Sequence, residues 1–443
     1  MNEKERLDLA EWAMQQALDR GAGEASVVLR SERIVEIEHR DGKLDKLSDA
    51  QQNGLELEVY VDKRYSANST NDLRRDELAK FIEEAVASAR YLAQDEYRGL
   101  PDPRYYPAEP GGGLRIFDPD YEKVESRDRV KMAQAIEIAI RDAGGAGDRI
   151  ISATGSYSDS RIEMVRVHSN GFVGGLRATR FDVSADVTIR DGAGGRLDDW
   201  SGATTRFYGD LAVPLYLGEE AVERAVAKIG QKKIASGEYD LLVENRAGRR
   251  LVRMLQEPLG GRALQQKTSF LDGMMHKRVG SDKLTVIDDP TVPKGLGSRI
   301  FDGEGLVARV MPVFEEGTLR NYYVDVYYGR KLGMEPTTAW PSNLVFSGGE
   351  RPLEEMVRDV KRGILVQGFI GGNSNSTTGD FSVGIAGFLV EGGRRTTPVH
   401  EMNISGNTRD LFSRLAEVGN DPYRYSSQRT PSMLFEGVQF SGV

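Results

Sequence analysis

The sequence predicts an α+β fold with two N-terminal two-layer α/β units, each with an antiparallel meander, followed by a C-terminal β-rich, sandwich- or barrel-like domain. Within the first 236 residues, helical periodicity gives way twice to alternation of apolar and polar residues. From Gly237 onward, short apolar runs are separated by glycine-containing turns. The regular alternation of strands and helices that builds a parallel nucleotide-binding sheet is missing.

The first predicted domain, residues 1–108, contains two helices and a meander. Apolar residues spaced as on one helix face run from Leu7 to Leu18, and glycines at 21 and 23 end that helix. Strands are predicted at residues 25–29, 33–40 and 54–61, and a second helix at residues 78–89. The stretch 95–113 is rich in Pro, Gly and Tyr, and we interpret it as a linker.

The second predicted domain, residues 109–236, repeats the order of helix, meander and helix. Its helices are predicted at residues 127–141 and 219–229. Between them, strands are predicted at residues 150–157, 161–168, 175–190 and 204–208. The turns Ser169-Asn170-Gly171 and Asp191-Gly192 are strong hairpin signals, so we expect antiparallel neighbours.

The third predicted domain, residues 237–443, is mostly β-structure. It opens with a strand at residues 239–243 and a helix at residues 247–259. Further helices are predicted near residues 352–361 and 408–418. Strand-like apolar runs occupy residues 284–288, 305–314, 318–328, 363–370, 381–391 and 433–440.

Composition narrows the function classes. The net charge of −9 and the lack of long Lys/Arg runs argue against a nucleic-acid partner, because phosphate contacts need clustered cations. The absence of cysteine excludes disulfides and thiolate chemistry. No apolar stretch has the length of a signal peptide or a membrane span. We therefore expect a cytoplasmic protein with no nucleic-acid and no membrane partner.

No sequence motif marks a catalytic centre. The histidines His39, His168, His276 and His400 are isolated, and lone histidines more often pack or face solvent than catalyse. Nucleophile elbows, phosphate loops and dinucleotide fingerprints are missing. The acidic pairs 198–199 and 288–289 suit turns better than a cation site.

One polar segment, residues 371–380, is a candidate for peptide binding. Its small residues leave backbone N–H groups open, and its polar side chains can pair with a peptide backbone. The alternative reading is a mobile hairpin loop, which the residues alone favour. The candidate contact residues are Asn373, Ser374, Asn375, Thr378 and Asp380.

Ordered similarity along nearly the whole chain resembles the TldD/PmbA family. The residues that carry the resemblance lie at 54–59, 66–73, 169–172, 285–290, 295–298, 301–305, 317–319, 373–382 and 404–407. The resemblance implies a subunit of a cytoplasmic metalloprotease that removes leader peptides and degrades unfolded peptides. In the zinc-bearing type, a His-Glu-x-x-x-His helix and a C-terminal cysteine would hold the metal, leaving one position for water.

The zinc motif is absent from the matching positions of this chain. In an ungapped comparison on the helix 247–259, the two histidines correspond to Val252 and Glu257, and the general-base Glu corresponds to Arg253. Residues 419–430, which match the stretch leading to the cysteine, contain none. We therefore expect no catalytic residue, no metal and no cofactor in this chain, with zinc in a partner subunit.

This departure resembles the PmbA/TldE-like branch, labelled modulator of DNA gyrase. The resemblance implies a heterodimer with a TldD-like zinc-bearing sibling that acts on an extended or unfolded peptide, and a homodimer when the chain is alone. A second hypothesis is a non-proteolytic binding protein acting on a toxin–antitoxin or DNA gyrase partner. A third is a hydrolase with a different site around His400 and Asp380.

Overall fold

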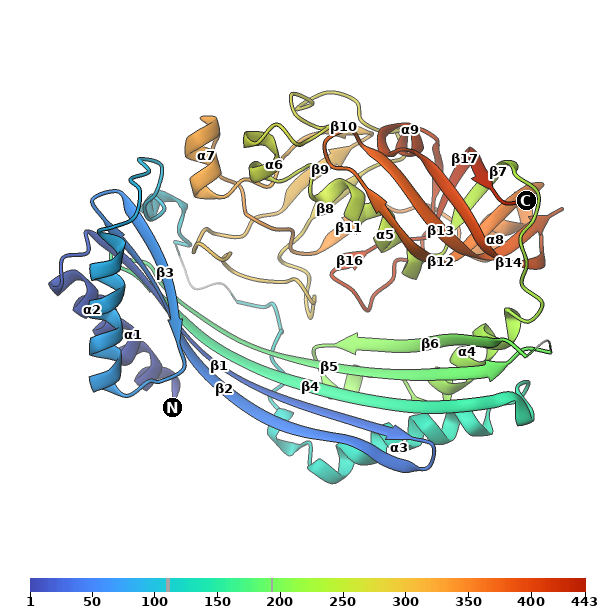
Figure 1. Ribbon diagram of the computed structural model, residues 1–443, viewed down its shortest axis with the longest axis horizontal. Helices are drawn as coiled ribbons and strands as arrows, with labels where there is room; N and C mark the ends of the chain where they lie inside the picture. The colour runs from blue at the N-terminus through green and yellow to red at the C-terminus, as the bar shows by residue number, and fades with distance from the viewer. Residues whose placement is uncertain (109–111, 193) are drawn as a thin grey trace.

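A long, curved antiparallel sheet forms the base of the molecule (Figure 1). The computed structural model describes residues 1–108, 112–192 and 194–443. The strand order is β3-β2-β1-β4-β5-β6. The bounds are β1 Glu24–Arg40, β2 Lys43–Val61, β3 Arg64–Thr70, β4 Ile150–His168, β5 Val173–Arg190 and β6 Arg196–Thr205.

The strands of this sheet are longer than predicted. The runs at 25–29 and 33–40 form the single strand β1, and the run at 54–61 is only the second half of β2. Likewise, the runs at 150–157 and 161–168 join in β4. The breaks predicted between these runs were wrong. Polar residues can continue a strand where one face of its sheet is not covered by helices.

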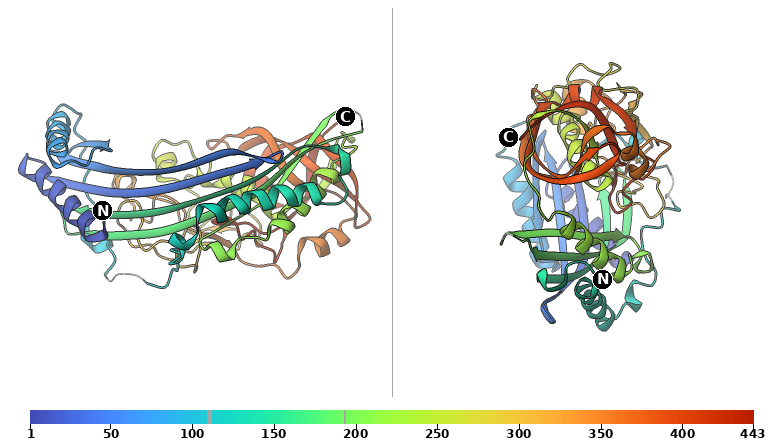
Figure 2. Two further views of the ribbon diagram at one scale, coloured as in Figure 1. Left: turned by 90° about the horizontal axis from the view of Figure 1, so that it is seen from below. Right: turned by 90° about the vertical axis from the view of Figure 1, so that its right-hand side faces the viewer.

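Four helices cover the outer face of the sheet (Figure 2). The first pair, α1 (Glu3–Asp19) and α2 (Arg75–Ala89), packs at one end, and α3 (Ser126–Asp142) and α4 (Pro214–Ala227) pack at the other. Side chains alternate between the two faces of a strand, so the odd-numbered apolar residues of β1 pack in the cores beneath both helix pairs. The even-numbered residues face the concave side.

The two predicted N-terminal units share one sheet. Strand β1 of the first unit pairs with β4 of the second from Ser26↔His168 to Arg40↔Thr154. The predicted boundary between residues 108 and 109 meets residues 109–111, which lie outside the described residues. The α+β class with antiparallel meanders is confirmed.

The C-terminal region contains a closed five-stranded barrel, seen end-on in Figure 2, which confirms the barrel-like prediction. Its order is β14-β13-β12-β7-β17, and pairing of β14 with β17 closes it. The bounds are β7 Gly237–Val243, β12 Arg362–Ser374, β13 Asp380–Glu391, β14 Arg394–Asn407 and β17 Met433–Ser441, with β15 Leu415–Val418 continuing beyond β17. Strand β14 was not predicted, because Pro398 interrupts its apolar pattern.

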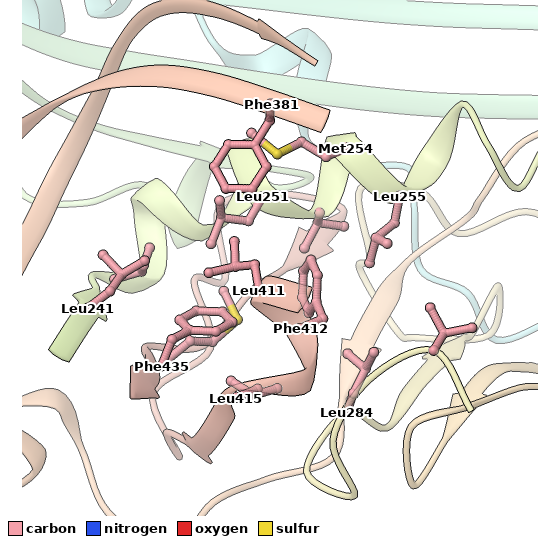
Figure 3. Packing of buried hydrophobic residues seen from close by; sticks show 14 of the residues in the cluster. Leu241, Leu251, Met254, Leu255, Leu284, Phe381, Leu411, Phe412, Leu415 and Phe435 are labelled. Atoms are coloured by element: carbon pink, nitrogen blue, oxygen red, sulfur yellow. The ribbon is translucent and has the colours of Figure 1, made fainter. Parts of the chain in front are cut away.

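A smaller sheet of order β10-β9-β8-β11-β16 lies beside the barrel. The strands are β8 Val286–Asp288, β9 Met311–Glu315, β10 Thr318–Leu319, β11 Leu344–Phe346 and β16 Gln428–Arg429. The helices of this region are α5 Asn245–Gln256, α6 Gly261–Gln265, α7 Val326–Leu332, α8 Leu353–Asp359 and α9 Thr408–Ser413. Leucines of α5 join phenylalanines of α9 and β17 in one core (Figure 3).

Several elements predicted for this region differ in extent; the strand predicted at 305–314, for example, is β9 at Met311–Glu315. The predicted strand at 318–328 ends early, because the Asp325 side chain accepts a hydrogen bond from the Tyr328 N–H and begins α7. The predicted helix at 408–418 ends at Ser413, and β15 follows. A polar cap at Asp325 overrides the strand pattern at α7. Pairing with β17 overrides the helical pattern at β15.

The C-terminal region lies across the concave face of the long sheet (Figure 1). At one end, Arg330 of α7 donates hydrogen bonds to backbone carbonyls of residues 97, 99 and 100. At the other, Arg224 of α4 makes a two-pronged ion pair with Glu244. Within the described part of the chain, no helix combines the length and hydropathy that crossing a bilayer requires.

Candidate functional site

A cleft lies between the long sheet and the C-terminal region. One hollow of about 890 Å3 is bounded by β6, α4, α5, residues 367–372 of β12 and residues 386–388 of β13. A second, of about 580 Å3, lies between the concave face of the sheet and residues 423–428. The two hollows share Trp200, Arg246 and Arg249, so they meet at the N-terminal half of α5.

Helix α5 presents a row of arginines to this cleft. Arg246, Arg249, Arg250 and Arg253 recur at helical spacing and all line the larger hollow. The opposite face carries leucines that enter the C-terminal core (Figure 3). The helix therefore has one apolar side that fixes it and one cationic side that faces open space.

The first of these arginines belongs to a buried ion-pair network. Asp199 lies near Arg224 (3.4 Å), Lys228 (3.1 Å) and Arg246 (3.8 Å), and Arg224 also holds Glu244. Burial alone would raise the pKa of Asp199, but the charges of Arg224 and Lys228 outweigh it and lower that pKa. This network joins β6, α4 and α5. With Glu220, which lies 3.9 Å from Arg246, its three carboxylates match its three cations.

The remaining three arginines of this row have no carboxylate partner in the part of the chain that the structure describes. Arg249 and Arg253 make no hydrogen bond or ion pair with any described residue, whereas Arg250 donates to the carbonyls of Gly371 (3.2 Å) and Gly372 (3.1 Å). The Nε of Arg250 is buried without a partner among the described residues. Burial, followed by the charges of Arg253 and Arg180, lowers the pKa of Arg249. The cleft is therefore cationic where these side chains meet.

Strand β12 leaves one backbone edge open beside α5. Strand β7 pairs with β12 only from Gly363 to Val366, and then the chain turns into α5. Beyond Val366, β13 pairs with the other edge of β12, and no described strand pairs with residues 367–372 on the side of β7. Those residues line the larger hollow, so the cleft contains an unpaired strand edge that can accept an extended peptide.

The positions compared with the zinc motif do not converge. Val252 is 4% exposed and packs in the core, Arg253 faces the cleft, and Glu257 is exposed beyond the last residue of α5. Residues 419–430 do lie against the start of α5, since Asn245 contacts both Asp421 and Thr430. Among the described residues, no group of three or more His, Cys, Asp or Glu is placed to hold a metal ion.

The predicted peptide-binding segment is divided by the structure. Asn375, Thr378 and Asp380 close the β12–β13 hairpin, with Thr378 Oγ1 donating to Asp380 Oδ2 at 2.7 Å and Asn375 Oδ1 accepting from two backbone N–H groups. Asn373 and Ser374 are exposed at the end of β12, next to the glycines that line the cleft. The segment is thus a hairpin with its last strand residues beside the cleft.

The hydrolase pairing of His400 with Asp380 is not assembled. Asp380 pairs with Asn407 on β14, seven residues beyond His400, which corresponds to roughly 20 Å along the strand. His400 lines the larger hollow of the cleft, and Asp380 does not. His168 is buried, with its Nδ1 3.0 Å from the Tyr106 hydroxyl, and burial lowers its pKa to about 3.

Sequence reasoning missed the arginine row and the buried role of Asp199. The spacing Arg246, Arg249, Arg250 and Arg253 on a predicted helix was a readable signal of one cationic face. The pairing of Asp199 with Arg224 and Arg246 was not readable, because the three residues come from different elements.

Models of one protein family match three successive parts of the chain. Models of the PmbA/TldA metallopeptidase domain 1, central domain and C-terminal domain match residues 25–89, 119–229 and 236–442. Metalloprotease PmbA of Escherichia coli O157:H7 is 27% identical, covering 98% of this chain and 96% of that protein.

Solved structures share the fold. A crystal structure from Bacteroides thetaiotaomicron VPI-5482, described as a candidate modulator of DNA gyrase, matches all of both chains with 41% identity and a TM-score of 0.96. TldE from Thermococcus kodakarensis has a TM-score of 0.84 over 98% of this chain and 100% of that one. At 22% identity, the second likeness supports the fold alone.

Proposed function

Because this chain belongs to the PmbA/TldD metallopeptidase family, we propose that it is the PmbA/TldE-like, non-catalytic subunit of a two-protein cytoplasmic zinc peptidase. In this role it pairs with a TldD-like zinc-bearing sibling and holds an extended or unfolded peptide for cleavage. The observation that carries the proposal is the cleft, which combines an open strand edge with a helix that lacks metal-ligand side chains.

The side chains of α5 do not suit zinc. Zinc sites in proteins use Cys, His, Asp or Glu side chains that converge on one point. Val252 is aliphatic and packed in the core, Arg253 is a cation, and Glu257 follows the end of the helix. We assign the metal, the activated water and the general base to the sibling, and only peptide binding to this chain.

Peptide binding is assigned to the open edge of β12. An extended peptide can pair with the backbone of residues 367–370 as an added strand, which leaves its side chains on alternate sides. The carbonyls of Gly371 and Gly372 already accept from Arg250. The exposed Asn373 and Ser374 prolong this edge and can bond to the same peptide. Asn375, Thr378 and Asp380 contribute by keeping the hairpin rigid.

A cleavage assay tests this proposal. The chain alone, the zinc-bearing sibling from the same genome alone, and their mixture are incubated with a labelled unfolded peptide. We expect turnover that rises when this chain is added to the sibling and stops when a chelator removes zinc. Chelator-insensitive cleavage by this chain alone would overturn the proposal.

A second candidate is a non-proteolytic binding protein that acts on DNA gyrase or on a toxin–antitoxin pair; the description of the Bacteroides relative as a modulator of DNA gyrase supports the gyrase partner. Capture of partners on the tagged chain in native lysate separates the two. Recovery of the zinc-bearing sibling favours the peptidase subunit. Recovery of gyrase or an antitoxin without the sibling favours the second candidate.

A further inference from the structure

The cleft carries more positive charge than its own acids neutralise. The protein as a whole has a formal net charge of −9. Among the described residues, the larger hollow is lined by seven cationic side chains and by two carboxylates, Asp198 and Asp199. Asp199 is taken up by Arg224, Lys228 and Arg246. Arg249 and Arg253 are left without a described carboxylate partner, so this surface is cationic against the overall charge of the molecule.

Arg250 is held in a fixed position between these two residues. It donates to the carbonyls of Gly371 and Gly372 on the open end of β12, and its Nε is buried with no described partner. A buried guanidinium N–H without an acceptor is costly unless a ligand supplies one. The open donor lies between α5 and the strand edge, where a bound peptide would run.

The spacing of the arginines suits an extended chain. Arg249 and Arg253 are four residues apart on α5, so their Cα atoms are separated by roughly 6 Å along the helix axis. Side chains at positions i and i+2 of a strand lie on the same side, roughly 7 Å apart. Two carboxylates in such an alternating pattern can meet two guanidinium groups, each of which favours paired N–H···O bonds.

We propose that the cleft selects extended peptides with acidic side chains at alternate positions, and that Arg249, Arg250 and Arg253 form the anion-binding subsite. This inference rests on the proposed function, because it specifies the substrate of the same cleft. Single-stranded nucleic acid is the weaker ligand. The open strand edge offers backbone pairing that only a peptide can use.

Fluorescence anisotropy with short labelled peptides tests the proposal on the full chain. The probes are an alternating Glu/Ser peptide, the matching Gln/Ser peptide and a single-stranded oligonucleotide. We expect the Glu/Ser peptide to bind about tenfold more tightly than the Gln/Ser peptide, with the difference shrinking as salt is added. This comparison uses the unaltered protein and does not depend on the folding of any variant.

Variants then locate the subsite. Arg249→Gln with Arg253→Gln should weaken Glu/Ser binding by about tenfold while Gln/Ser binding stays the same. The matched control, Arg394→Gln with Arg409→Gln, removes the same charge from exposed positions outside the cleft lining and should have no effect. Arg249→Lys with Arg253→Lys should restore part of the affinity, because the charge remains and the paired geometry is lost.

The outcomes separate this inference from the proposed function. Equal binding of the Glu/Ser and Gln/Ser peptides overturns the acidic selectivity and leaves the peptide-holding role standing. Binding of neither peptide overturns both. Tighter binding of the oligonucleotide, lost in the Arg249/Arg253 variant, shows that the subsite serves nucleic acid and overturns the inference. A loss of affinity in the Arg394/Arg409 control shows a general charge effect and also overturns it.

Discussion

At the residue scale, Glu304 is the acid whose environment changes its chemistry most clearly. It lies between the long sheet and α7, where its Oε2 accepts a hydrogen bond from the Val326 N–H. Burial, then the nearby charges of Asp302, Asp325 and Glu58, raises the pKa of Glu304 to about 8. The side chain is therefore protonated in the folded protein at neutral pH.

This pKa predicts how stability depends on pH. Between about pH 4.5 and 8 the folded state holds a proton on Glu304 that the unfolded state has lost, so the free energy of unfolding falls as pH rises. Glu304→Gln keeps an oxygen acceptor for Val326 and removes the titration. We expect the variant to have the higher melting temperature at pH 8 and little difference at pH 4.5. If the melting temperatures of the two proteins changed with pH in parallel across this range, the assignment would be contradicted.

Arg224 gives a second prediction at this scale. Its guanidinium is nearly buried and pairs with Glu244 and Asp199. Arg224→Met leaves the Glu244 carboxylate without its partner and should destabilise the protein by about 3 kcal/mol, measured as a shift in urea unfolding. Adding Glu244→Gln should recover part of the loss, because the orphaned charge is removed. A double variant as unstable as the single one would show that packing, and not charge, causes the effect.

Single residues also show how far the sequence could predict the site. The side-chain types of Val252 and Arg253 alone make them unsuitable as zinc ligands, whereas Glu257 is a possible ligand type whose position after the end of α5 only the structure shows. The spacing of Arg246 to Arg253 was visible but was not interpreted. Arg249 and Arg253 have no carboxylate partner among the described residues. This depends on which residues fold against α5, and that information is not local.

At the element scale, the close contact of β4 with α3 depends on glycine. A Cβ built on Gly155 would lie 2.1 Å from the Ala133 carbonyl oxygen and 2.6 Å from the Glu137 backbone nitrogen. Gly155→Ala should therefore displace α3 and cost about 1–3 kcal/mol in thermal or urea unfolding. The control is Gly209→Ala, where an added Cβ meets nothing within 4 Å. Equal stability of the two variants would mean that α3 shifts without cost.

The end of β12 carries the prediction for peptide contact. Asn373→Ala with Ser374→Ala removes exposed side chains that take part in no described side-chain hydrogen bond, so the fold should be unaffected. Peptide affinity should fall by about threefold to tenfold if these residues bond to the peptide. Asp380→Ala is the comparison, because it loosens the hairpin through Thr378 and Asn407. Unchanged anisotropy titrations for the first variant would exclude these contacts.

The predictability of an element follows from where its determinants lie. Helices α1 to α5 were predicted because their apolar faces repeat at helical spacing. Strand β14 and the full lengths of β1 and β2 were not predicted. They contain polar residues and Pro398, and pairing with neighbouring strands keeps these segments extended. Helix α7 depends on a cap at Asp325 inside an apolar run.

At the scale of the whole molecule, the two N-terminal units predicted from the sequence contribute strands to one continuous sheet. The pairing of β1 with β4 joins segments more than a hundred residues apart, and no local pattern encodes it. That sheet supplies one wall of the cleft, and the C-terminal region supplies the other. The site thus exists only in the assembled chain, which explains why the sequence motifs did not reveal it.

The central claim is that catalysis lies in the sibling and peptide binding in this chain. The most direct test is cleavage by the reconstituted pair after a change on each side. Replacing a motif histidine of the sibling should reduce turnover to the uncatalysed rate, whereas Glu257→Gln in this chain should leave turnover unchanged. Persisting cleavage without the sibling's motif, or its loss in Glu257→Gln, would place the catalytic centre in this chain and contradict the claim.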